Sequence, residues 1–212
     1  MSSAITLAVP TSVQSVTTAL GQIPWTSPDN ASADDGQYAE CIFSPFVLEQ
    51  ESEALRAAYD FSQLLDSDLP FGIEVAVKRK ADTSLAVADL SVQLVHAGSA
   101  IGESKPAIGS WPTLDGTLVY GAIGDTWSVG LTAAMVKAPT FGVQLRCRSL
   151  VGTGPIAFVD SILMSLHYDH EEEQGIVHAP LNDLGVFTQE RMRWVSMQAG
   201  YPFPDEARTR AR

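Results

Sequence analysis

The sequence predicts an all-β, antiparallel fold for its central part. Two observations support this: apolar and polar residues alternate in several short runs, and clusters of glycine, proline and aspartate separate those runs. Alternation with a period of two is the pattern of a strand with one face in a core and the other in water. Many short strands separated by turn residues predict an antiparallel sandwich or barrel.

The clearest alternation occurs in four runs, at residues 71–81, 90–95, 141–149 and 156–168. In the first run, Ile73, Val75 and Val77 share one face, which predicts a half-buried strand. Cys147 falls in the apolar register of the third run. This position indicates a buried free thiol, with a disulfide to Cys41 as the alternative.

Three segments follow from this pattern: an N-terminal arm at 1–20, a β-sandwich domain at 21–168 and a C-terminal extension at 169–212. The arm has little charge and reads as extended chain, with room for one strand. Inside the domain, residues 50–61 have a helical composition, although their latter part also suits a strand. In the extension, Thr188 is suited to cap a short helix that ends before Gly200.

The extension is too short to build a core of its own, yet it carries several aromatic side chains. We therefore expect it to bury them on its own domain or on another subunit, and we favour another subunit. The candidate partner-binding residues are Phe187, Trp194, Tyr201 and Phe203.

Charge and hydropathy exclude two kinds of partner. The net charge is −12, and neither the first 168 residues nor the remainder has an excess of lysine and arginine, so we expect no nucleic acid partner. No run reaches the roughly 18 apolar residues of a membrane span. The first 20 residues lack the basic start of a signal peptide, so we expect none.

An ordered set of short motifs extends from Trp25 to Tyr168. It begins with Trp25 and the stretch 27–31, continues through the strand at 71–81, and passes Trp111-Pro112, Tyr120-Gly121 and Asp125 with Trp127 before Asp160, Ile162 and Tyr168. This order resembles a β-sandwich module of structural proteins in tailed bacteriophages. The resemblance covers about residues 21–168, and many such modules end where the extension begins. In this interpretation the tryptophans cover the ends of the sandwich, and the two aspartates bond to loop backbone.

Catalytic and metal sites have little support in the sequence. Nucleophile-elbow, zinc-protease and P-loop motifs are absent. The stretch 29–36 offers oxygen ligands that calcium prefers, but it lacks EF-hand spacing. His167 and His170 precede acidic residues in what reads as a solvated linker. The acidic groups Asp66/Asp68 and Glu49/Glu51/Glu53 suit glycosidase chemistry only if a cleft positions them. We expect no enzyme activity, metal or cofactor.

The combined interpretation is a non-enzymatic virion structural protein with a jelly-roll-like β-sandwich, made in the bacterial cytoplasm and resident in the virion. We expect a capsid-associated decoration or head–tail component that forms a homo-oligomer and binds other virion proteins through its terminal arms. A tail, baseplate or fibre-attached module is one alternative. The other is a carbohydrate-binding module for a host surface glycan, in which Trp111 would stack on a sugar.

Overall fold

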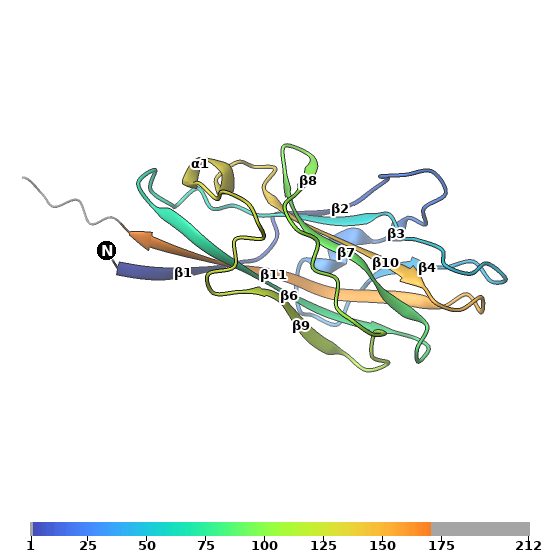
Figure 1. The fold of residues 1–212 in the computed structure, drawn as a ribbon. Helices are drawn as coiled ribbons and strands as arrows, with labels where there is room; N and C mark the ends of the chain where they lie inside the picture. Colours follow the sequence, from blue (N-terminus) through green and yellow to red (C-terminus); the bar gives the residue numbers. More distant parts are fainter. Residues whose placement is uncertain (1, 171–212) are drawn as a thin grey trace, which may run out of the picture. The chain divides into compact units, whose positions relative to one another are not determined.

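The computed structural model describes residues 2–170 as two antiparallel β-sheets (Figure 1). Sheet A contains β1 (Ser2–Ala8), β3 (Trp25–Thr26), β4 (Ala39–Ile42), β6 (Leu69–Ala81), β9 (Gly116–Ala122) and β11 (Ile156–His170). Sheet B contains β2 (Ser12–Val16), β5 (Ala54–Ala58), β7 (Val87–His96), β8 (Ser99–Ile101) and β10 (Gly142–Ser149). Two short helices, the 3-10 helix η1 (Pro28–Ala31) and α1 (Ala133–Val136), lie in the connections. The predicted all-β class is confirmed.

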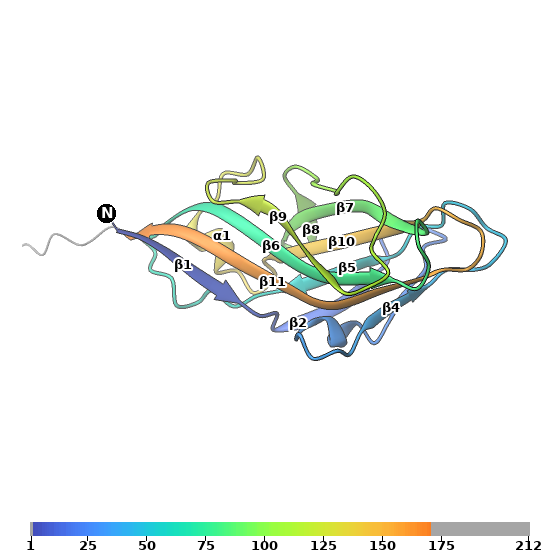
Figure 2. The ribbon, with the colours of Figure 1, turned by 90° about the horizontal axis from the view of Figure 1, so that it is seen from below.

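The 15-residue strand β11 is the centre of sheet A. One of its edges pairs with β6 over nearly its whole length, from Ala157 to Asp169. Its other edge pairs first with β4 and then with β1, which lie one after the other along β11. Figure 2 shows β1 and β6 on either side of β11. Two partners are needed on this edge because β4 covers only four residues of it.

From β4 onward the chain crosses repeatedly between the sheets. The order is β3-β4-β11-β6-β9 in sheet A and β2-β5-β10-β7-β8 in sheet B, so most consecutive strands belong to different sheets. All four strands predicted from alternation are present with slightly different bounds, as β6, β7, β10 and β11. For residues 50–61 the helical interpretation is wrong and the alternative of a strand is confirmed: residues 54–58 form β5, because Leu55 and Ala57 alternate into the core.

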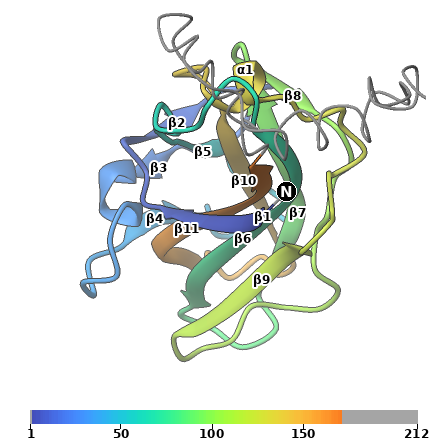
Figure 3. The ribbon, with the colours of Figure 1, turned by 90° about the vertical axis from the view of Figure 1, so that its left-hand side faces the viewer.

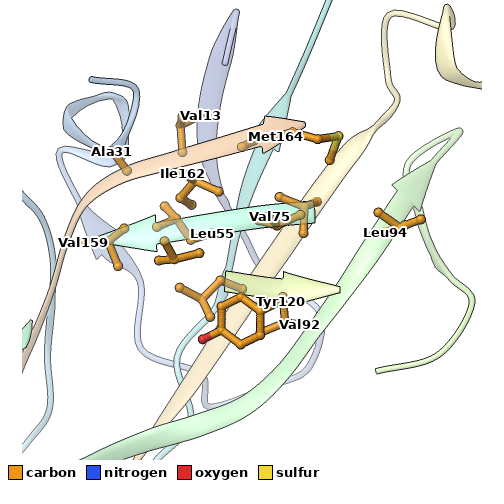
Figure 4. Close-up of a cluster of buried hydrophobic side chains, with 14 of the residues drawn as sticks. Val13, Ala31, Leu55, Val75, Val92, Leu94, Tyr120, Val159, Ile162 and Met164 are labelled. Carbon is orange, nitrogen blue, oxygen red and sulfur yellow. The ribbon is translucent and has the colours of Figure 1, made fainter. Parts of the chain in front are cut away.

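The inward side chains of both sheets form one hydrophobic core (Figure 4). Ile162 and Met164 of β11, Val75 of β6 and Leu94 of β7 are fully buried there. Figure 3 shows the two sheets from one end, with this interior between them. The aromatic members include Trp25, Tyr59, Phe61, Trp111, Tyr120, Trp127 and Phe141.

The first 20 residues differ from the expected arm, because they supply one strand to each sheet. β1 pairs with β11 in sheet A, and β2 pairs with β5 in sheet B. The crossing occurs at Pro10, which is buried. All described residues, 2–170, belong to one compact unit. The predicted helix near Thr188 lies outside the described residues.

We predict that Gly142→Ala destabilises the sheet B pairing of β10 with β5. A Cβ at Gly142 would clash with the carbonyl oxygen of Ala57, so the two strands would have to separate slightly. The expected loss in the free energy of unfolding is about 1–3 kcal/mol, measured by urea denaturation. Gly130→Ala is the matched control, because no atom lies within 4 Å of a Cβ built there. Equal urea midpoints for the two variants would contradict the close approach of Gly142 to the backbone of Ala57.

Candidate interaction surface

In strand β1 the larger apolar side chains face outward and the small side chains face the core. Its small residues Ala4 and Ala8 face the core, whereas the larger Ile5, Leu7 and the following Val9 face outward. These three outward side chains are 60%, 64% and 62% exposed. We call Ile5, Leu7 and Val9 the β1 stripe. Exposed apolar side chains that alternate along one strand form a continuous row, and such rows mark surfaces that other molecules cover.

The backbone of β1 is also open along one edge. Within residues 2–170, β1 pairs only with β11, so the backbone groups on its far edge have no strand beside them. Soluble proteins usually protect such an edge with charged side chains, proline or a bulge. β1 reads SSAITLA and contains none of these protective residues. An open, uncharged edge accepts a strand from another chain by backbone hydrogen bonding.

A polar pair, His167 and Glu74, lies beside the β1 stripe on the outer face of sheet A. Ile5 lies opposite His167 in the β1–β11 register, and Leu7 lies opposite Ser165. The Nε2 atom of His167 lies 2.9 Å from a carboxylate oxygen of Glu74 on β6. His167 is only 5% exposed, so its burial fixes the position of this polar pair beside the β1 stripe.

Trp111 and Tyr120 of the ordered motifs both hydrogen-bond a buried carboxylate. Asp89 on β7 accepts hydrogen bonds from Trp111 Nε1 at 2.7 Å, from the Tyr120 hydroxyl at 2.8 Å and from the Ala107 amide at 2.8 Å. It also forms an ion pair with Arg79, whose guanidinium carbon lies 4.7 Å from the Trp111 ring centre. Trp111 is 2% exposed, so its ring is not available to stack on a sugar.

Burial controls the ionisation of this cluster. Removal from water lowers the pKa of Arg79, because the charged guanidinium loses hydration. Burial raises the pKa of Tyr120 to about 12, because the phenolate form would be poorly solvated there, although Arg79 offsets part of this rise. Every polar group of the cluster is therefore engaged in holding β6, β7, β9 and the loop at 107–111 together.

The loop that follows Trp25 is held by a second buried carboxylate. Asp160 on β11 accepts backbone hydrogen bonds from Asp35 at 3.3 Å and Gly36 at 3.0 Å, and it lies 2.7 Å from Lys78 Nζ. Hydrogen bonds to Asp160 and Asp34 raise the pKa of Lys78. The expected role of Asp160 as a partner of loop backbone is confirmed. Asp125 acts in the same way, because it accepts from the Trp127 amide at 2.8 Å.

The two cysteines are free and fully buried, as the favoured interpretation predicted. Cys41 is on β4 of sheet A and Cys147 is on β10 of sheet B, so their thiols meet in the core between the sheets. The hydrogen bond to Cys147 and burial raise the pKa of Cys41, which keeps the thiol protonated.

The other candidate groups are dispersed. His167 contacts Glu74, whereas His170 contacts Asp68 at 2.6 Å, so the two histidines do not share a site. Asp66 is 93% exposed at its side chain and pairs with Lys137, whereas Asp68 is buried and contacts His170. Among residues 2–170, no group of three or more histidine, cysteine or acidic side chains is placed to hold a metal ion. No helix within the described part is long and apolar enough to span a membrane.

The predicted partner-binding residues Phe187, Trp194, Tyr201 and Phe203 lie outside the described residues. The β1 stripe was not predicted as a candidate. Its alternation is visible in the sequence, but the sequence does not say which of its two faces meets the core. No protein-family model matches the chain, and a search of curated proteins finds no match.

We predict that Asp89→Ala strongly destabilises the protein, because Arg79 would keep a buried charge without its partner. The expected loss in unfolding free energy is about 3–5 kcal/mol by urea denaturation. Asp66→Ala removes an exposed partner of Lys137 and serves as the matched control, with no measurable change expected. Similar midpoints for Asp89→Ala and the wild type would contradict a structural role for the carboxylate.

We predict that stability falls between pH 10 and pH 12. The pKa of Tyr120 rises from 10.0 to about 12 on folding, so the unfolded chain loses its proton first. Its contribution is complete below pH 10 and is lost as the pH rises toward 12, on the order of 1 kcal/mol per pH unit.

Urea denaturation of Tyr120→Phe across this pH range tests the assignment. The variant should show a shallower decline, with part of the slope retained because burial also raises the pKa of Tyr59. If Tyr120→Phe leaves the slope of unfolding free energy against pH unchanged, groups other than Tyr120 cause the loss of stability.

Proposed function

We propose that the protein is a non-enzymatic structural subunit of a tailed-bacteriophage virion that assembles through its terminal segments. The observation that carries this proposal is β1, an N-terminal strand with an open edge and an outward apolar stripe. An open strand edge with apolar side chains is unfavourable when it is exposed to water. Such a strand is well suited to a subunit interface. The favoured location is the capsid surface or the head–tail junction.

The order of the strands supports this proposal. Without β1, β2 and β3, the sheets read β4-β11-β6-β9 and β5-β10-β7-β8. Numbering these eight strands in chain order gives the two four-stranded sheets of a jelly roll, an architecture used by viral capsid domains and also by lectins. We therefore propose a jelly-roll-like β-sandwich, to which the N-terminal segment adds one strand per sheet.

A second copy of the chain is the simplest partner for β1. Two β1 strands related by a twofold axis pair antiparallel, so the same backbone groups are satisfied in both copies. A register centred on Thr6 places Ile5 of each copy opposite Leu7 of the other, on the same face. The outward apolar residues of both copies then contact one another as cross-strand pairs. Other virion proteins would be bound by the C-terminal extension.

The alternatives have less support. A tail, baseplate or fibre-attached module would use the same assembly surfaces, and it differs only in its place in the virion. Glycan binding through stacked tryptophans is disfavoured, because Trp25, Trp111 and Trp127 are at most 4% exposed. The polar residues of the described unit are also largely engaged in structural hydrogen bonds, as in the cluster around Asp89.

We predict that the full chain is a homo-oligomer in solution and that Ile5→Lys with Leu7→Lys lowers its mass, measured by light scattering. Charged side chains on the β1 stripe oppose burial against a second copy. The thermal midpoint of the dissociated protomer should indicate an intact fold, because both side chains are already exposed.

The matched control is Leu20→Lys with Leu114→Lys, which changes two apolar side chains that are 101% and 80% exposed but lie in connections outside β1. This control should retain the wild-type mass. A monomeric wild type, or an oligomer that the β1 variant leaves intact, would overturn assembly through β1.

A further inference from the structure

The outer face of sheet B contains a groove of about 260 Å³ beside the β7–β8 turn. Strands β2 and β5 form one side, and Gly98 of the turn with Pro139 and Thr140 after α1 form the other. Figure 1 shows the β8 hairpin and α1 on the same side of the unit as β2. The groove is separate from the β1 stripe, which lies on sheet A.

Arg56 of β5 is held in this groove in a fixed orientation. Its Nε atom donates to the side-chain oxygen of Gln144 at 3.1 Å, and its Nη1 atom donates to the carbonyl oxygen of Gly98 at 2.8 Å. These two bonds leave Nη2 without a protein partner among residues 2–170. Neutral acceptors do not neutralise the charge of a guanidinium. Its charge and its remaining N–H donors are therefore available to a ligand.

The charge of Arg56 is not compensated within the described part of the chain. No carboxylate of residues 2–170 lies within ion-pair distance of it, whereas Arg79 and Arg146 each have a carboxylate partner. Arg56 is also the one charged residue among those that line the groove. Partial burial lowers the pKa of Arg56, as expected for a cation that has lost hydration without gaining a counter-ion.

The surroundings of Arg56 offer neutral hydrogen-bonding groups. Gln14 of β2 lies opposite Arg56, and Gln144 and Gln93 continue the same row across β10 and β7. Gln144 is 4% exposed and is held by Arg56, whereas Gln14 is exposed and lines the groove. Amide and hydroxyl groups beside a guanidinium match a ligand that carries a carboxylate and further polar groups.

We propose that this groove binds the carboxylate of a small ligand, with the guanidinium of Arg56 as the recognition group. The carboxylate accepts from Nη2, and Gln14 hydrogen-bonds the neighbouring part of the ligand. This site is independent of the proposed assembly role and of the β1 stripe. The carboxylate belongs either to an acidic sugar or to an acidic amino acid, and both fit the size of the groove.

The test is isothermal titration of the full-length protein with two carboxylate probes, glucuronate and N-acetylglutamate, and with glucose as the neutral comparison. We expect at least one carboxylate probe to bind and glucose not to bind. Arg56→Gln should weaken that binding about tenfold to a hundredfold, because a charge-assisted hydrogen bond is lost. The probe that binds more tightly identifies the source of the carboxylate.

Arg146→Gln is the matched control, because Arg146 is on the same sheet but already pairs with Glu51. It should leave binding unchanged. Arg56→Lys provides a second test, since it keeps the positive charge and should retain more affinity than Arg56→Gln. Thermal melts confirm that each variant is folded. Failure of both carboxylate probes to bind, equal binding of glucose, or undiminished binding by folded Arg56→Gln would overturn the proposal.

Discussion

The pairing requirements of β11 govern the rest of the described structure. A strand of 15 residues inside a sheet needs partners along both edges, or its backbone groups lose water without gaining hydrogen bonds. β6 satisfies one edge almost completely, but β4 satisfies only the first part of the other. The N-terminal strand β1 covers its last part, from Met164 to His170. The position of β1 is therefore a consequence of the length of β11, and its own far edge becomes the open edge of sheet A.

Buried polar groups then hold the loops to the sheets. Asp89 joins Arg79, Trp111 and Tyr120 from three separate segments, and Asp160 holds the loop at 35–36 through backbone amides. A buried carboxylate is costly unless it is fully hydrogen-bonded, and Asp89 meets this condition with several donors. Asp89 and Asp160 are thus committed to structural contacts, and the two proposed binding features lie on the outer surfaces of the two sheets.

Those two surfaces differ in character. Sheet A presents the apolar β1 stripe and an open backbone edge, which suit another polypeptide strand. Sheet B presents a groove whose one charged lining residue, Arg56, has no carboxylate partner among residues 2–170, which suits a small anion. Because the outer faces of two packed sheets point in opposite directions, a subunit assembled through β1 would keep the groove accessible. Assembly and ligand recognition are in this way compatible within one subunit.

The sequence alone determined the β class and four of its long strands, because alternation over six or more residues reports directly on burial of one face. It also identified Asp125 and Asp160 as partners of loop backbone. The sequence was less informative where a segment was short or where its composition fitted two structures equally well. Residues 54–58 have a composition compatible with helix or strand, and the core contact of Leu55 decided between them.

Only the tertiary structure decided which surfaces are open. The alternation in residues 4–9 predicts a strand, but its register with β11 decides which face is inward. Ala4 lies opposite the core residue Tyr168, whereas Ile5 lies opposite His167 on the outer face. Likewise, no local pattern distinguishes Arg56 from Arg146. The difference lies in whether a carboxylate distant in sequence folds beside each guanidinium, as Glu51 does for Arg146. Periodicity along a chain encodes burial, whereas the partners of a surface charge depend on strands brought together by the fold.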